Sequence, residues 1–132
     1  MNPNLIDAAL ERHLLTLPGA PSIAWEDVAF TPTVGQAYLQ VNQLRNTPID
    51  HAESLDVRED RGILQVTVVH PAGGGKVAAL ELAHKVAQHF ALGTRLEFAG
   101  GAVTVYHSPD IGTAYPDEGW LRIPVSIRWT TA

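Results

Sequence analysis

The chain has 132 residues, which is enough for one compact domain with its own hydrophobic core but leaves no room for a second. Hydrophobic residues make up 45% of the sequence and charged residues only 17%, a globular composition that excludes a disordered or fibrous protein. The formal net charge is −5 and no basic run occurs, so tight binding to nucleic acid is not expected. We expect one domain over residues 1–132, whose sparsely charged surface favours contacts with other proteins.

The sequence contains no cysteine, which excludes disulfides, thiolate metal sites and a cysteine nucleophile. The first residues carry no basic segment, and the apolar runs are far shorter than the roughly 20 residues that a membrane helix needs. We therefore expect a soluble protein made in the cytoplasm, without membrane contact.

Two helices and several strands are predicted along the chain. The first helix opens the sequence, because Ile6, Leu10 and Leu14 recur with helical spacing behind the potential cap Asn2. Pro18-Gly19 ends this helix, and a second apolar helical pattern covers residues 76–91. Alternation of apolar and polar residues predicts the strands, which we place at 23–25, 37–45, 63–70, 94–98, 102–108 and 119–129.

The strand predicted over residues 119–129 contains Pro124, which cannot donate a hydrogen bond to a neighbouring strand. We therefore expect this strand to lie at a sheet edge or to carry a bulge at Pro124. The order of the elements indicates the α+β class. The predicted fold is a mainly antiparallel mixed sheet of about five to six strands, with two helices packed on one face.

The stretch 46–61 is polar and lacks a clear period, so we predict a long polar loop or a loose hairpin tip. Loops of this length in compact domains are usually functional or disordered. We expect the segment to be mobile in the free subunit and ordered in an assembly, where its charges select a partner; an idle solvated loop is the alternative. The candidate protein-interface residues are Asp50, Asp56, Arg58, Glu59, Asp60 and Arg61.

The motifs of common enzymes are incomplete in this sequence. The glycines before Lys76 lack the spacing of a phosphate-binding loop, and Val77 stands where such a loop needs serine or threonine. The six histidines are scattered, and a single Glu81 and His84 pair on a helix is more often solvated than metal-bound. Paired carboxylates such as Glu59 and Asp60 also read as solvated loop charges. We expect no enzyme, no catalytic residue, no cofactor and no metal.

Several short motifs, in order along the chain, resemble the phage tail terminator-like family. The resemblance covers roughly residues 4–129, and each motif is structural. The first half contributes Ile23-Ala24-Trp25-Glu26-Asp27, Phe30-Thr31-Pro32 and Tyr38-Leu39-Gln40-Val41; the second contributes Gly62, Gln65-Val66-Thr67-Val68, Pro71-Ala72-Gly73-Gly74-Gly75, Gly119-Trp120 and Ile123-Pro124-Val125-Ser126-Ile127.

This resemblance implies a phage or prophage protein that completes long non-contractile tails. Such proteins form a hexameric ring on the finished tail tube, stop tube polymerisation and offer a surface for head joining, without a catalytic motif. The implied partners are further copies of the chain, the major tail tube protein and the head-tail connector protein. The implied location is the virion tail, assembled in the bacterial host cytoplasm. The alternatives are a head-tail connector or minor tail adaptor, or an unrelated cytoplasmic binding domain.

Overall fold

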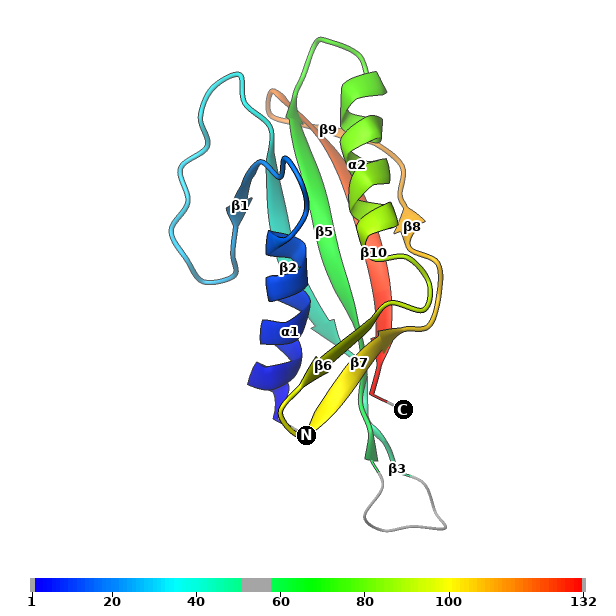
Figure 1. Ribbon diagram of the computed structural model, residues 1–132. Helices are drawn as coiled ribbons and strands as arrows, with labels where there is room; N and C mark the ends of the chain where they lie inside the picture. Colours follow the sequence, from blue (N-terminus) through cyan, green and yellow to red (C-terminus); the bar gives the residue numbers. More distant parts are fainter. Residues whose placement is uncertain (1, 51–57, 132) are drawn as a thin grey trace.

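The computed structural model describes residues 2–50 and 58–131 of the chain (Figure 1). Both predicted helices and the predicted long strands are present, joined by several shorter strands. The elements in chain order are α1 (Pro3–Leu15), β1 (Ser22–Ala24), β2 (Tyr38–Arg45), β3 (Ile49–Asp50), β4 (Arg58–Glu59), β5 (Arg61–Pro71), α2 (Val77–His89), β6 (Arg95–Phe98), β7 (Gly101–Val105), β8 (Asp110–Ile111), β9 (Tyr115–Asp117) and β10 (Trp120–Thr130).

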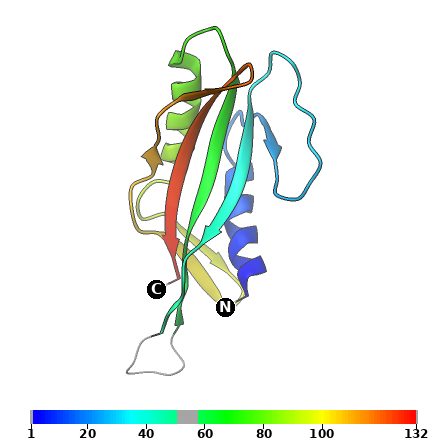
Figure 2. The same ribbon diagram turned by 180° about the vertical axis from the view of Figure 1, so that it is seen from behind.

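One curled sheet contains most of the strands. Its order is β1-β2-β5-β10-β7-β6, while β8 and β9 pair separately along β10. The β1 to β2 pairing is parallel and the other pairings are antiparallel. The predicted α+β class with a mixed, mostly antiparallel sheet is therefore confirmed. A second, two-stranded sheet of β3 and β4 projects beyond the ends of β2 and β5 (Figure 2).

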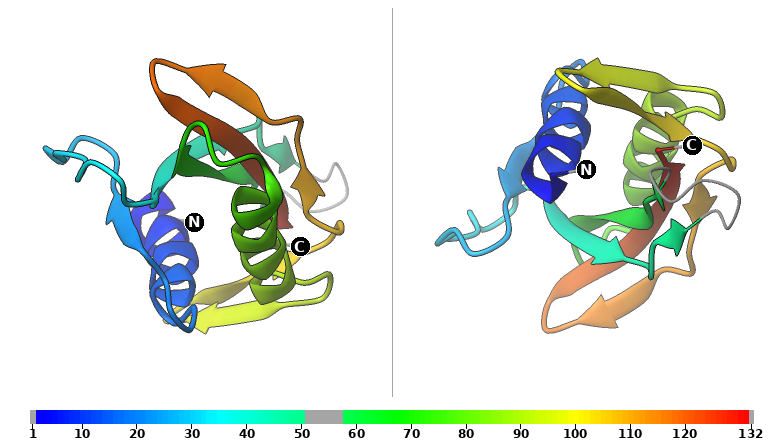
Figure 3. Two further views of the ribbon diagram at one scale, coloured as in Figure 1. Left: turned by 90° about the horizontal axis from the view of Figure 1, so that it is seen from above. Right: turned by 90° about the horizontal axis from the view of Figure 1, so that it is seen from below.

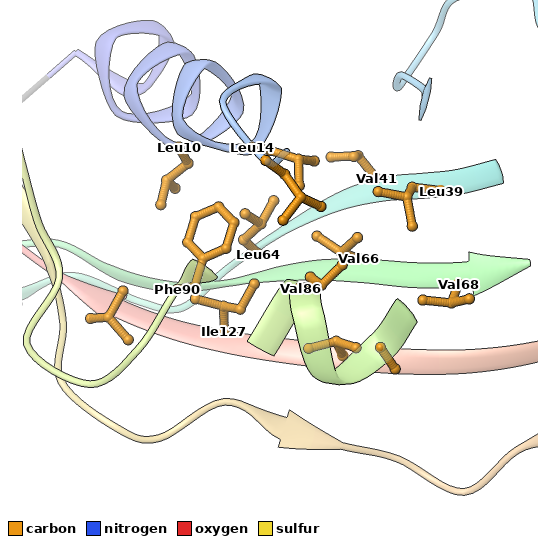
Figure 4. Close-up of a cluster of buried hydrophobic side chains, with 14 of the residues drawn as sticks. Leu10, Leu14, Leu39, Val41, Leu64, Val66, Val68, Val86, Phe90 and Ile127 are labelled. Atoms are coloured by element: carbon orange, nitrogen blue, oxygen red, sulfur yellow. The ribbon is translucent and has the colours of Figure 1, made fainter. Parts of the chain in front are cut away.

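The two helices lie inside the curve of the sheet, against the same face of β2, β5 and β10 (Figure 3). Alternate residues of the two longest strands point into this space, because each strand residue faces opposite to the next. The registered pairs Leu64 with Ile127 and Val66 with Val125 are fully buried. The helices contribute Leu10, Leu14 and Val86 to the same core, and Phe90, the residue after α2, lies among them (Figure 4). Each such side chain stabilises the fold by about 1.5–3 kcal/mol through burial.

The start of α1 follows from its first residues. The side-chain oxygen of Asn2 accepts a hydrogen bond from the Asn4 backbone at 2.9 Å, and Pro3 occupies the first helical position, where its missing N–H is not needed. This confirms the capping residue that the sequence predicts.

The position of β10 corrects the prediction that this strand lies at an edge or carries a bulge. It lies inside the sheet, between β5 and the strands β7, β8 and β9. The Gly112 N–H donates to the Pro124 carbonyl at 2.8 Å, so the Pro124 carbonyl points away from β5 and toward Gly112. The Pro124 nitrogen points the same way, because both backbone groups of a residue in an antiparallel strand lie on one side. Pro124 therefore breaks no hydrogen bond to β5. Gly112 lies opposite Pro124, and Tyr115 lies opposite Arg122. The neighbouring segment therefore advances three residues between these two pairs, whereas β10 advances two. The extra residue therefore lies in the neighbouring segment and not in β10.

The segment 46–61 is also corrected. Its described ends are not a loop, because Ile49 pairs with Glu59 and Asp50 with Arg58 in an antiparallel hairpin. The hairpin alternative is therefore right for these residues. Residues 51–57 lie outside the described part of the chain.

Candidate assembly surface

The root of the β3–β4 hairpin is held by hydrogen bonds of two buried acidic residues. Glu59 and Asp60 are only 6% and 8% exposed, which corrects the expectation that they are solvated loop charges. The Glu59 carboxylate accepts hydrogen bonds from the Arg61 Nε and from the Thr130 hydroxyl, the latter at 3.0 Å. The Asp60 backbone N–H donates to the Thr131 hydroxyl at 2.9 Å. The hairpin is thus tied to the end of β10.

Of the other predicted interface residues, the structure describes Asp50, Arg58 and Arg61. Asp50 is exposed on β3 and faces Arg58 of β4 in the backbone register. Asp56 lies outside the described residues. The structure thus brings Glu59 and Arg61 together directly, and the contact role of all six residues stays a prediction.

The outer face of the sheet, opposite the helices, is polar. Within the described residues no helix covers this face of β2, β5 and β10 (Figure 2). At one end an aromatic cluster closes it, with Tyr38 lying 4.8 Å from Phe30 and 5.5 Å from Trp120 between ring centroids. The middle of the face carries uncharged polar side chains on three adjacent strands, and the apolar Leu44 and Ile63 lie toward its other end. The polar side chains are Gln40, Asn42, Gln65, Thr67 and Ser126.

Cations on this outer face are already paired. Arg122 donates from Nε to the Asp117 carboxylate at 2.7 Å and from Nη1 to the Gln40 side-chain oxygen at 2.6 Å. Arg128 pairs with Asp110, and this contact lowers the pKa of the Asp110 carboxyl. The face therefore offers hydrogen-bonding groups with little uncompensated positive charge, which fits a protein surface better than a phosphate backbone.

Two adjoining grooves cross the outer face. The larger has a volume of about 610 Å³ and lies between β2 and the loop that follows β1, with Trp25 and Phe30 in its wall. The smaller, of about 470 Å³, continues over β5 and β10. Gln40, Asn42 and Arg122 line both. Sequence reasoning missed these grooves, although the polar alternation of the predicted strands was a usable signal.

Among residues 2–50 and 58–131, no three His, Asp or Glu side chains gather as a metal site. Within the same residues no helix is both long and apolar enough to span a bilayer.

Comparison with known proteins places the chain among phage tail proteins. The sequence model for the phage tail terminator protein matches residues 5–129, so the chain belongs to the phage tail terminator family, a family of structural tail proteins. One solved protein structure, whose name gives no function, is 28% identical in sequence to this chain and superposes on it with a TM-score of 0.80. The alignment covers 100% of this chain and 96% of the other. Comparison with curated proteins found no match. The resemblance drawn from the short motifs is confirmed at the level of the family.

Proposed function

We propose that the protein terminates a phage tail by forming a hexameric ring on the end of the tail tube. The ring covers the tube end, so that no further tube subunit can add, and it offers a surface to the head-tail connector protein. Membership of the phage tail terminator family carries this proposal. The action needs contact only, so we assign the chain no catalytic role and no cofactor.

The subunit surface supports assembly by contact. Only 17% of the residues are charged, and the outer face of the main sheet carries neutral polar groups. A ring of identical subunits needs two different patches that meet head to tail, and such contacts close when the rotation between copies divides a full turn. Stable interfaces of this kind bury about 1,600 Å² in total. The exposed Asp50 and its register partner Arg58, both in the hairpin, are proposed contacts within the assembly.

Deletion of the gene from an active phage tests the proposal. Without the ring, tubes are expected to run past their normal length and to remain unjoined to heads, because nothing blocks further addition. Electron microscopy of the tails measures both properties, and expression of the wild-type chain in trans is the control. Tails of normal length that join heads would contradict the proposal. Normal-length tails left unjoined would assign the chain to the connector instead.

Self-association is the second measurable consequence. Chemical cross-linking with purified tail tubes present, followed by a denaturing gel, is expected to give products of this chain above the 14.3 kDa of one subunit, since the tube end acts as the template for the ring. A monomeric mass in dilute solution without tubes is compatible with the proposal. A monomeric mass at every concentration, tubes included, opposes it.

A further inference from the structure

Strand β2 has an open edge beyond the end of β1. Strand β1 pairs only with Tyr38, Leu39 and Gln40, whereas β2 continues to Arg45. The Asn46 N–H donates to the Arg61 carbonyl at 3.0 Å, which fixes the alternation of the antiparallel ladder. The backbone groups of Asn42 and Leu44 therefore face β5. Those of residues 41, 43 and 45 face away. The parallel register of Ala24 with Gln40 places the Val41 N–H against the Ala24 carbonyl of β1, whereas no other described strand pairs with residues 43 and 45.

A groove lies directly beside this edge. The cavity of about 610 Å³ begins where β1 ends, and Val41 and Asn42 of β2 form part of its wall. Trp25, Phe30 and Pro32 of the following loop line its other side. In Figure 2, β2 is the outermost of the three long strands, and below β1 only α1 lies beside it, on the inner side. The edge thus has space for an extended chain in line with β1.

The surroundings of the open edge are acidic. Asp7 and Glu11 of α1 lie on its inner side, and Glu26 and Asp27 line the groove. Burial raises the pKa of the Glu11 carboxyl; the Gln43 hydrogen bond opposes this shift, and the nearby charges of Asp7 and Glu26 add to it.

The cations near the edge do not balance these carboxylates. Arg45 pairs with Asp7, and Arg122 in the groove pairs with Asp117. Two side-chain oxygens beside the edge, Asp7 Oδ1 and Gln43 Oε1, are buried and have no hydrogen-bond donor within the described residues. The site therefore has acceptors and negative charge in excess.

We propose that the open edge of β2, residues 41–45, binds an extended and positively charged segment of a partner protein as an added strand. Backbone hydrogen bonds to the Val41 carbonyl and to residues 43 and 45 provide the pairing, as in other cases of strand addition. The partner's lysine or arginine side chains meet Glu11, Glu26 and Asp27, and this charge complementarity sets the choice of segment. Only the source of the segment, a tail or head protein that meets the ring, rests on the proposed function.

A second copy of the chain is the less favourable occupant. At two other edges of the main sheet, β6 has only four residues, with Arg95 paired to Glu97, and the outward-facing residue of β9 is Pro116, which lacks an N–H. The chain also carries a net charge of −5, which opposes its own acidic edge. These features leave a basic partner segment as the proposed occupant.

Amide hydrogen exchange on the full chain tests the proposal. The probe is a synthetic peptide of about seven residues that alternates lysine with valine, a length typical of strands. We expect exchange at residues 43 and 45 to slow at least about tenfold, as newly bonded amides are protected. The amides of Asn42 and Leu44 already bond to β5 and should not change. Raised salt should weaken the effect, because the attraction is between exposed charges.

Matched controls separate charge from shape. The same peptide with glutamate in place of lysine is expected to give no protection. Glu26→Gln should weaken binding of the lysine peptide several-fold, by loss of one exposed charge contact. Glu81→Gln changes an exposed carboxylate on α2 and should leave the binding unchanged.

Several outcomes would overturn the proposal: absence of protection with the lysine peptide, equal protection with the glutamate peptide, or protection that rises with protein concentration without peptide. The last result would identify a second copy as the occupant. The assay needs neither a ring nor a tail. Its failure would leave the capping proposal standing, and failure of the gene-deletion test would leave the peptide result intact.

Discussion

Gly62 shows how a single residue type permits the packing of the core. A Cβ atom at this position would lie 2.5 Å from Cζ2 of Trp129 and 2.7 Å from the Leu44 carbonyl oxygen. Trp129 is 1% exposed and lies on β10, beside Gly62 in the register. The ring therefore crosses β5 only because Gly62 has no side chain.

Replacement of Gly62 by alanine should lower the free energy of unfolding by about 1–3 kcal/mol, the usual range for an overpacked core. Gly74→Ala is the matched control, because a Cβ there has no heavy atom within 4 Å and its φ is not positive. Urea unfolding of both variants measures the effect. Equal urea midpoints for the two variants would contradict this prediction, because Trp129 would then make room for the added Cβ with no loss of stability.

The ends of α1 and α2 are joined by a reciprocal histidine pair. The rings of His13 and His89 stack with centroids 4.1 Å apart, over an edge of Phe90. Each Nε2 lies 2.7 Å from the backbone carbonyl oxygen of the other histidine. Since a carbonyl only accepts, each Nε2–H donates, and each ring satisfies a carbonyl in the last turn of the opposite helix.

His13→Phe keeps a ring in the stack but removes one of these hydrogen bonds, so we expect a loss of about 1 kcal/mol in unfolding free energy. His84→Phe is the control, because His84 is exposed on α2. Thermal unfolding compares the two variants. An equal change in both would contradict a specific role for the His13 contact.

At the scale of elements, the junction of α1 with β2 has a pH-dependent contribution. Burial raises the pKa of the Glu11 carboxyl, so the folded protein holds this proton more tightly than the unfolded chain. Ionisation of Glu11 therefore destabilises the fold. The effect is absent below the ordinary glutamate pKa of about 4.3 and complete above the raised pKa.

Glu11→Gln should consequently raise the melting temperature at neutral pH, with no gain at about pH 3, where glutamate is protonated. The variant keeps an acceptor for the Gln43 side-chain N–H, which bonds to Glu11 at 3.2 Å. Melting curves across this pH range provide the measurement. A constant difference between variant and wild type would show that ionisation of Glu11 is not the cause.

Helices and strands with a clear hydrophobic period were predictable from the sequence, but the order of the strands in the sheet was not. The alternation in β5 and the helical spacing in α1 are local, because one buried face dictates them. The position of β10 depends on strands that are distant in the sequence. The prediction of an edge or a bulge at Pro124 was wrong, because the Pro124 nitrogen faces an irregular neighbouring segment. The hairpin at 46–61 was ambiguous, since two-residue strands leave almost no pattern.

For the whole molecule, the candidate surface was less predictable than the core. Short motifs sufficed for the family, which residues 5–129 match. The grooves and the open edge of β2 form where β1 stops short of its neighbour, a property of the three-dimensional pairing. Burial of Glu59 likewise depends on Thr130, 71 residues away. Residue type alone therefore misassigned Glu59 as a solvated charge.

The length of tubes grown from purified tube protein tests the capping claim most directly. Tubes are allowed to polymerise with increasing amounts of this protein, and their lengths are measured by electron microscopy. If the protein caps tube ends, growth should stop when only a few copies per tube are present, and Gly74→Ala, which should leave the fold intact, should act like wild type. Tubes of unchanged length at every ratio, with folded protein present, would contradict the account.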